Sequence, residues 1–494
     1  MVCESHNYQK KGIHRASTDC PPRARNLSRK AFDPAWYSLG PMSRPRVVAA
    51  VTPIALFVFG VFAGGASAQA PTPPPQTQAP APPSTQVAGR LLTLEECIAI
   101  ALEAQPRIQA TLADYAAARY RVNQAFSPLL PQLAGVVSAT RSNVPTIVTN
   151  AAGNNVSVVQ TRQLGDTFLA QVQLSQLLFD FGKTLAATDA ARKLAEVAVE
   201  DVELQRQLIS LTVKEAYTNT LFSQRLIRVQ EQAVERAELN LRSAKGFFDV
   251  GTRPKSDVAR AEVDVANARV DLIRARNALR TAVVALNTAM AIDVDSPTQI
   301  VDNLIYQPIT LDRQQLRADS LRQRPEYRQS KLRASAAEAL ERQTFRNFFP
   351  DVTGTGAYGA AQSQLNESWT LGLSLNWSLF DGGNRIARYQ EAKANVEGAR
   401  ARVKSTELDI VQNVEQAEIA VEESQERIQA AQTLVASAQE NFRLAQGRFD
   451  AGVGTILELT DAQLALTQAQ NTESQALADY RIALARLDRA VGRR

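Results

Sequence analysis

The stretch Ser368-Trp-Thr-Leu-Gly-Leu-Ser-Leu-Asn-Trp-Ser-Leu-Phe-Asp381 decides the fold, because its alternate side chains suit opposite solvents. Side chains alternate between the two faces of a β-strand. One face here is therefore large and apolar, with Trp369 and Trp377 at its ends, and the other carries Thr, Gly, Ser and Asn. A transmembrane strand is apolar toward lipid, polar toward a lumen and aromatic at both interfaces, over ~9–11 residues. An edge strand of a soluble sheet also alternates, so the rest of the chain must decide between the two.

The front of the chain predicts a signal peptide at residues 42–68. Arg44 and Arg46 precede an apolar run, and the segment Ala66-Ser-Ala68 follows it. A basic region, an apolar region and an A-x-A cleavage site are the parts of a secretory signal. The alternative is a transmembrane anchor, but the apolar run is shorter than the ~20 residues that a transmembrane helix needs. Because a signal peptide belongs at the N-terminus, we expect Met42 to be the true start.

The basic character of the chain lies in this front part. The net charge of residues 1–68 is +6. The net charge of the whole chain is +5, so the remainder has a net charge of −1. A protein that binds nucleic acid needs a basic surface on its folded part, so we expect no nucleic-acid partner. Residues 1–41 are expected to be a non-native extension from a mis-assigned start. Residues 69–90 are rich in proline and predict an extended spacer.

The residue types needed for most enzyme chemistry are missing after residue 68. Cys97 is the single cysteine there, and His6 and His14, the two histidines of the chain, precede it. This composition offers no metal cluster, catalytic triad or thiol–imidazole pair. The sequence therefore predicts a protein that is not an enzyme and has no catalytic residue, cofactor or metal site.

Two motifs recur along the chain at a constant spacing. LLFDFG at 177–182 matches SLFDGG at 378–383, and GFFDVGT at 246–252 matches GRFDAGV at 447–453, both at an offset of 201 positions. Pro131 and Pro350 mark an earlier equivalent pair at an offset of 219. The chain is thus a twofold repeat. We assign the repeats to 91–290 and 325–490, with a connector at 291–324, and expect the 18 extra residues of the first repeat in a hairpin loop within 143–165.

Each repeat is expected to read helix, β-hairpin, long helix, turn, helix. Thr93 and Glu96 have the spacing of a capping box at the first helix, Pro106 is expected to kink that helix, and Asp180 and Asp381 are expected to cap the long helices. Helices are predicted at 94–126, 183–249, 254–289, 325–348, 384–450 and 455–490. Strands are predicted at 133–142, 167–179, 352–361 and 368–380.

The helices that follow the turns, predicted at 254–289 and 455–490, each carry a coiled-coil seam. Apolar residues recur at alternating spacings of 3 and 4 from Val258 to Ala289, and shifting by 201 gives a second seam from Leu459 to Ala490 with one charged break, Glu473. Such a seam predicts close packing and left-handed supercoiling. A helix of ~65 residues at ~1.5 Å per residue is about 100 Å long, which exceeds a globular domain.

Four strands per chain cannot close a barrel. Open strand edges are not tolerated in lipid, so the strands of several chains must combine. Two chains would give eight strands, whose interior is filled by side chains, and three would give twelve, which leave room for a lumen. The fold class expected from the residues is therefore mainly α, with a pair of transmembrane β-hairpins and two internal repeats.

The paired LFDxG junctions, the twofold repeat and the turn Arg448-Phe-Asp-Ala-Gly-Val-Gly-Thr-Ile-Leu-Glu-Leu-Thr-Asp-Ala462 resemble the TolC-type outer membrane efflux protein family, the outer membrane factors. The resemblance covers about 91–490. It implies a homotrimer with a 12-stranded β-barrel in outer membrane lipid, continuous with a long coiled-coil α-barrel in the periplasm. It also implies a passive exit duct of a tripartite efflux or type I secretion system, joined to an inner-membrane pump by a periplasmic adaptor, or membrane fusion protein.

In this family the periplasmic gate lies where the helix pairs turn. The resemblance places Glu458 and Asp461 where the family has acidic rings that narrow the entrance and favour cations. Three copies of an acid around a threefold axis would concentrate negative potential in a small opening. Asp257 falls on the partner turn, where polar links between helices hold the closed state. This chain has Gly454 where some members carry Arg, and Arg253 lies on the first turn instead. The closing links are therefore expected to differ here.

The remaining residues implied by the resemblance lie at the tips and in the membrane. The residues expected to contact the adaptor are Gly251, Thr252, Gly452 and Gly454, and the membrane girdle is assigned to Trp369 and Trp377. Simpler roles stay open: the two tip glycines suit helix C-caps, and Glu458 has capping-box spacing from Thr455. A structural periplasmic coiled coil docked to the outer membrane is the alternative function.

Overall fold

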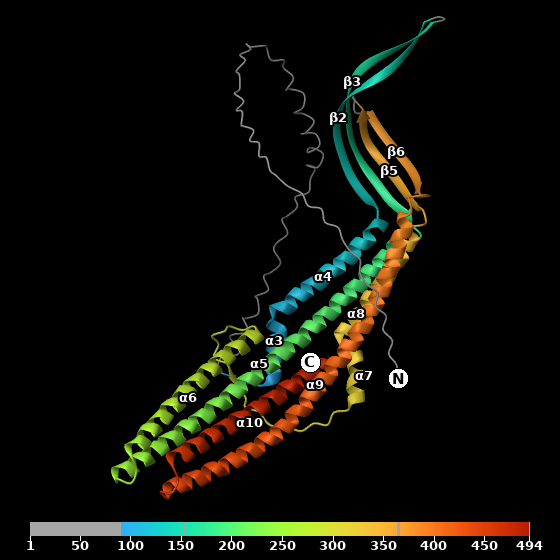
Figure 1. Ribbon diagram of the computed structural model, residues 1–494. Coiled ribbons are helices and arrows are strands. Elements are labelled where there is room, and N and C mark those ends of the chain that lie inside the picture. The colour runs from blue at the N-terminus through green and yellow to red at the C-terminus, as the bar shows by residue number, and fades with distance from the viewer. Residues whose placement is uncertain (1–89, 153–154, 363–365, 494) are drawn as a thin grey trace, which may run out of the picture. The chain divides into compact units, whose positions relative to one another are not determined.

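The computed structural model describes residues 90–152, 155–362 and 366–493. The expected extension and signal peptide, and the spacer up to residue 89, lie outside the described residues. Within the described part, each repeat contains a β-hairpin, a long helix and a shorter returning helix (Figure 1).

The first repeat forms these elements in order. They are β1 (Leu91–Leu92), α3 (Leu94–Ala104), α4 (Pro106–Phe126), the short 3-10 helix η1 (Ser127–Leu129), β2 (Gln132–Ala152), β3 (Asn155–Phe179), α5 (Lys183–Asp249) and α6 (Lys255–Met290). The predicted first helix is interrupted at Gln105, whose extended backbone precedes Pro106 at the start of α4. Thr93 and Glu96 form the predicted capping box.

The connector and the second repeat follow. Their elements are β4 (Gln299–Ile300), α7 (Arg313–Gln323), α8 (Pro325–Arg346), β5 (Asp351–Gln362), β6 (Asn366–Asn376), α9 (Asn384–Asp450) and α10 (Ile456–Val491). The long helices α5 and α9 each begin after a left-handed glycine, Gly182 and Gly383. Asp180 accepts hydrogen bonds from the backbone N–H groups of Gly182 and Thr184 at 2.9 and 2.7 Å, which satisfies donors that a helix start leaves open.

The seam of α10 is buried as predicted, whereas that of α6 is buried only in part. Nine of the ten seam positions of α10 are buried, and Glu473 is half-buried. In α6, five of the ten positions are buried. The difference follows from packing, because α10 lies against both α9 and α5 while α6 packs mainly on α5 (Figure 1).

The two hairpins form one antiparallel sheet in the order β2-β3-β5-β6. Residues directly opposite each other share a face of such a sheet, and Leu371, Gly356, Leu174 and Leu133 form one row across it. Other large apolar residues on this outer face include Val137, Phe168, Val172, Val352, Tyr358, Trp369, Leu373 and Leu375. The sheet thus presents an apolar face on all four strands, and not only on β6, whose sequence predicted a transmembrane strand.

One prediction about the first hairpin is wrong. The extra residues do not form a loop, because β2 and β3 stay paired from Asn143 opposite Leu164 to Ala152 opposite Asn155. They lengthen both strands beyond the shorter second hairpin. The stretch lacks a clean alternation of apolar and polar residues, so its sequence does not indicate a strand.

The connector consists of short elements, as its sequence predicts. It contains the helix α7, and β4 pairs in parallel with β1. Tyr217 of α5 donates a hydrogen bond to the carbonyl of Val301 at 2.9 Å, and Tyr480 of α10 donates to that of Gln307 at 2.6 Å. The connector is therefore tied to both repeats. Among the helices described, none combines the length and the apolar character needed to span a membrane.

Candidate functional site

The candidate site consists of the two turns that join α5 to α6 and α9 to α10. Gly251 and Gly452 have φ of 76° and 79°, a left-handed conformation that glycine adopts without steric cost. Their N–H groups bond back to the carbonyls of Phe248 and Phe449 at 2.9 and 3.0 Å. Both glycines thus end their helices, which confirms the C-cap role and leaves their contact with an adaptor a prediction.

Arg253 of the first turn reaches the second turn. Its Nη2 donates a hydrogen bond to the carbonyl oxygen of Gly454 at 2.5 Å, and its Nη1 lies 3.5 Å from Asp257. Both charged side chains are largely buried, at 12% and 16% exposure. Removal of one partner of a buried ion pair is costly, because it leaves the other charge buried without compensation. The structure thus brings together Arg253, Asp257 and Gly454 as a link between the two turns.

Two phenylalanines support this link. The guanidinium carbon of Arg253 lies 4.4 Å from the ring centre of Phe449, which is fully buried, and 5.7 Å from that of Phe247. The two rings meet edge to face at 5.6 Å. A cation over an aromatic face is attracted by the ring quadrupole, more so when water is excluded. Sequence reasoning missed both rings, although Phe449 belongs to the repeated motif that marks the turn.

The backbone at Gly454 is packed closely against residues at the end of α9, which leaves no room for a side chain. A Cβ at this position would lie 2.9 Å from the Cβ of Arg448 and from the backbone N of Phe449. Its N–H donates to the carbonyl of Arg448 at 2.8 Å. No side chain fits there without moving the backbone, and Arg253 approaches the Gly454 carbonyl from the other turn.

The two predicted acids of the entrance, Glu458 and Asp461, lie on the first turns of α10 and are exposed. The Thr455 hydroxyl accepts the Glu458 N–H at 3.2 Å, while the Glu458 carboxylate lies 3.5 Å from Arg448. The capping role of Thr455 is thereby established, and the Glu458 side chain remains at the surface. The structure does not bring these acids to Arg253. Their role at a pore entrance stays a prediction.

A second link between the repeats lies farther from the tips. The Thr460 hydroxyl donates to the Asp264 carboxylate at 2.8 Å, and the Asn240 amide donates to Gln463 at 2.6 Å. Sequence reasoning missed these contacts. The only available signal was the position of Asp264 seven residues after Asp257, which places both on one face of α6.

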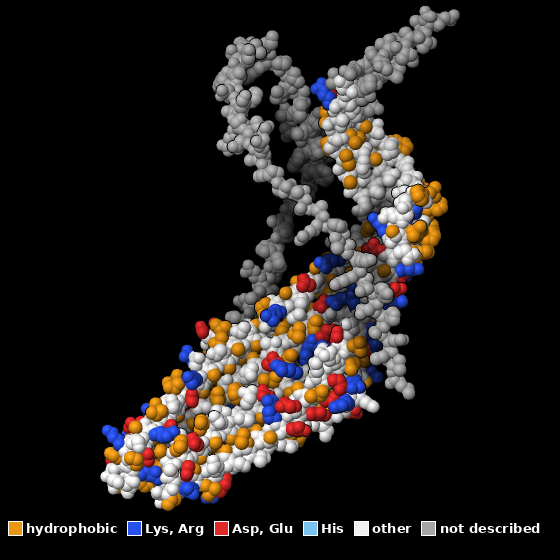
Figure 2. All heavy atoms as spheres, in the orientation of Figure 1, with side chains coloured by type: hydrophobic (Ala, Val, Ile, Leu, Met, Phe, Trp, Pro, Cys, Tyr) orange, Lys and Arg blue, Asp and Glu red, His pale blue; other side chains and the backbone are white. Residues whose placement is uncertain are grey.

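The predicted girdle residues flank the apolar face of β6. Trp369 and Trp377 are 71% and 53% exposed, and the Trp377 indole N–H donates to the carbonyl of Phe348 at 3.0 Å. Eight residues at ~3.3 Å each separate them by about 26 Å, close to the ~25 Å height of an apolar membrane band. In Figure 2, hydrophobic side chains gather over the end of β6, while charges of both signs are spread over the helices.

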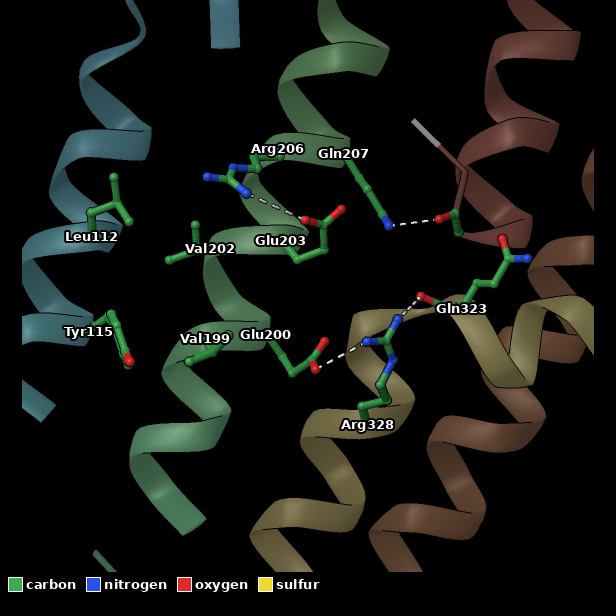
Figure 3. Close-up of a pocket in the computed structure, with 11 residues that line it drawn as sticks. Leu112, Tyr115, Val199, Glu200, Val202, Glu203, Arg206, Gln207, Gln323 and Arg328 are labelled. Atoms are coloured by element: carbon green, nitrogen blue, oxygen red, sulfur yellow. Dashed lines mark hydrogen bonds and ion pairs between the residues drawn. The ribbon is translucent and has the colours of Figure 1, made fainter. Parts of the chain in front are cut away.

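A cavity of about 530 Å³ lies on α5 between α4 and α8 (Figure 3). Its charged groups are neutralised within the chain. Arg328 Nη1 lies 3.2 Å from Glu200 and Arg206 lies 3.9 Å from Glu203, while Gln207 donates to the carbonyl of Gly492 at 2.8 Å. Its lining contains no Ser, Thr, Cys, Lys or His side chain.

Metal or thiol chemistry finds no support in the described part of the chain. Among these residues, no three His, Cys, Asp or Glu side chains are placed to hold a metal ion. Cys97 is fully buried in α3, and burial raises the pKa of its thiol to about 12. A thiol in such surroundings stays protonated and is inert.

The chain is similar to known proteins over most of its length. The model of the outer membrane efflux protein family matches residues 97–291 and 316–493. The outer membrane protein TolC of Escherichia coli K12 is 25% identical over 78% of this chain and 79% of its own length. Nodulation protein T of Rhizobium leguminosarum bv. trifolii is 22% identical over 75% and 82%.

Solved structures share the fold. The Campylobacter jejuni CmeC outer membrane channel superposes with a TM-score of 0.68 at 19% identity, covering 81% of this chain and 85% of that one. The open state of the Neisseria gonorrhoeae MtrE outer membrane channel gives 0.63 at 21% identity, covering 81% and 89%.

Proposed function

Because the chain belongs to the outer membrane efflux protein family, we propose that it is the passive exit duct of a tripartite efflux or type I secretion system. It lies in the bacterial outer membrane and reaches into the periplasm. The proposed assembly is a homotrimer, joined by a periplasmic adaptor to an inner-membrane pump. The pump supplies the energy, and the duct itself turns over no substrate and needs no cofactor.

The observation that carries this proposal is the open, one-sided sheet. Its order leaves β2 and β6 as free edges, and its outer face is apolar across all four strands. Lipid tolerates no unpaired strand edge, so the sheet is stable in a membrane only when other copies pair with β2 and β6. Three copies would supply twelve strands, which suffice to enclose a lumen.

We place the gate at the helical tips. The link from Arg253 to the carbonyl of Gly454 holds the two turns of one protomer together, and three exposed copies of Glu458 and Asp461 around an axis would concentrate negative potential at the entrance. Gly251, Thr252, Gly452 and Gly454 form the turns that an adaptor would meet first. Trp369 and Trp377 would mark the two lipid interfaces.

The test is single-channel conductance in a planar bilayer. Wild-type protein is compared with the double variant Glu458→Ala, Asp461→Ala, with Asp249→Ala, just before the first turn, as an acidic control. We expect a small cation-selective conductance that rises and loses selectivity in the double variant alone. Folded oligomer that forms no channel would favour the alternative of a structural periplasmic coiled coil docked to the outer membrane.

A further inference from the structure

Six aromatic rings form a continuous strip where the apolar outer face of the sheet meets the helices. This aromatic strip consists of Phe179, Phe181, Phe345, Phe348, Phe349 and Tyr389, and neighbouring ring centres lie 4.7 to 6.3 Å apart. It begins on the outer face, because Phe179 pairs with Val352 and Val352 pairs with Leu375. It continues past the end of α8 to the start of α9. The strip thus extends the apolar outer face from the sheet onto the helices.

Much of the aromatic strip is exposed in the single chain. Phe179, Phe345 and Phe349 are 54%, 48% and 39% exposed. A large exposed apolar patch marks a surface that contacts a membrane or another protein. Trp377, the expected girdle residue at this end of β6, donates its indole N–H to the carbonyl of Phe348. The aromatic strip therefore lies at the level expected for the periplasmic interface of the membrane, where aromatic side chains are enriched.

Phe181 adopts a backbone conformation that is unfavourable for its residue type. Its φ is 55°, whereas the equivalent position of the second repeat, 201 residues later, is Gly382 with a φ of 69°. A bulky residue in the left-handed region costs free energy that glycine avoids. The ring stacks on that of Phe349, with the centres 5.1 Å apart and the ring planes at 20°. The first repeat thus keeps a ring where the backbone favours glycine, and such strain is typical of functional positions.

Two unpaired cations adjoin the aromatic strip on α9. The Lys393 ammonium lies 4.8 Å from the centre of the Tyr389 ring, and Arg388, the neighbour of Tyr389, is exposed. Neither cation has an ion-pair partner among the residues that the structure describes. Arg385 differs from them, because Asp381 neutralises it at 3.0 Å. Arg388 and Lys393 are therefore available to an anion outside the chain.

The position of these cations matches the headgroup layer of a membrane. Arg388 is four residues beyond Asn384, where α9 begins beside the sheet, so it lies about 6 Å along the helix. The headgroup layer is roughly 5–8 Å thick on each side of a bilayer. Side chains lean toward the N-terminus of their helix, which brings Lys393 back toward the sheet. Glu391, the single acid within 384–396, lies about 200° around the helix from Tyr389 and so faces away from the strip.

We propose that the aromatic strip, together with Arg388 and Lys393, is a binding site for anionic phospholipid in the periplasmic leaflet of the outer membrane. The rings contact the acyl chains where these join the headgroup, and the two cations bind the phosphate. The inference rests on the proposed function, in which the sheet spans the membrane, and adds a lipid preference to it. A zwitterionic lipid offers the same acyl chains, but its own cation cancels the charge of its phosphate, so it binds more weakly.

The test compares two lipids on the purified oligomer in detergent. Native mass spectrometry measures the dissociation constants of phosphatidylglycerol and of zwitterionic phosphatidylcholine with the same acyl chains. We expect the wild-type protein to prefer phosphatidylglycerol. The double variant Arg388→Gln, Lys393→Gln should lose this preference, with binding of phosphatidylglycerol about fivefold weaker for each cation removed. The control Arg402→Gln, Lys404→Gln removes two exposed cations from α9 farther from the sheet and should keep the preference.

The variant Phe181→Gly tests the aromatic strip separately. It introduces the residue of the equivalent position 382 and relieves the left-handed backbone. The oligomer should therefore melt near the wild-type temperature in lipid-free detergent, while binding of both lipids weakens several-fold. A ring that only held α5 against the end of α8 would give the opposite result, a lower melting temperature with unchanged lipid binding.

Two outcomes would overturn the inference alone, in an oligomer that still inserts into vesicles and conducts. One is a preference for phosphatidylglycerol that survives the loss of both cations on α9, and the other is lipid binding that ignores Phe181→Gly. Folded wild-type oligomer that binds neither lipid, does not insert into vesicles and forms no channel would overturn the proposed function as well.

Discussion

Arg253 connects two turns that are 201 residues apart in the sequence, through one hydrogen bond to a backbone carbonyl. A hydrogen bond from a charged donor contributes about 1.5–3 kcal/mol. Arg253→Gln should therefore loosen the α9–α10 turn, and amide hydrogen exchange in residues 447–456 should speed up about tenfold or more. Lys255→Gln, an exposed position on the same turn, is the control. Equal exchange in both variants would show that Arg253 does not hold the turn.

Cys97 is the second residue whose surroundings make a sharp prediction. Burial raises the pKa of its thiol to about 12, so the thiolate, which is the reactive species, is scarce at pH 8. Alkylation of the native protein at Cys97 should be slower by roughly two to three orders of magnitude than after denaturation. Peptide mass spectrometry measures both rates. Rapid labelling of the native protein would mean that α3 opens readily.

At the scale of one element, β6 should distinguish its two faces. Leu373→Arg places a charge on the outer face and should cost about 2–4 kcal/mol if this position lies near the bilayer midplane. Ser374→Arg, the next residue, points to the inner face and should be tolerated. Thermal melting of the assembled protein in membrane vesicles compares the two. Equal stability would contradict the assignment of lipid to the apolar face.

The sequence predicts best those elements whose two ends are marked by capping or turn residues. The helices α5 and α9 occur at the predicted residues because an Asp and a left-handed glycine precede each and a glycine turn follows. The extension of β2 and β3 was missed because its sequence lacks a clean alternation of apolar and polar residues. Short elements are expected in the connector, but the position of α7 was not predicted because this helix is very polar and contacts α9 through ion pairs such as Arg313 with Glu418.

At the scale of the whole molecule, the repeat explains which parts of the site were predictable. The positions of both turns follow from the motif spacing, so Gly251 and Gly452 were found without a structure. The link from Arg253 to Gly454 was not, because its acceptor is a backbone carbonyl and carries no sequence signal. The packing of Phe449 beneath it depends on how the two repeats meet, which periodicity within one helix does not determine.

The last prediction concerns the assembled duct. Its helical tips should be needed for export, whereas its strands should be needed for insertion into the outer membrane. Gly452→Pro forces a φ near −65° where the turn has 79°, and so it should disrupt the α9–α10 turn while leaving the sheet intact. We expect cells that carry this variant to lose export while the protein still inserts into the outer membrane as an oligomer.

Gly447→Ala is the matched control for that variant. Gly447 lies within α9, and an added Cβ there meets nothing within 4 Å. Since Ala favours a helix over Gly by about 1 kcal/mol, export should be unchanged and the helix slightly more stable. Export is measured as accumulation of a fluorescent substrate in cells, and insertion by extraction of outer membranes. Normal export with Gly452→Pro would mean that neither the adaptor nor the gate depends on this turn, and would move the search for both to the contacts of Thr460 with Asp264.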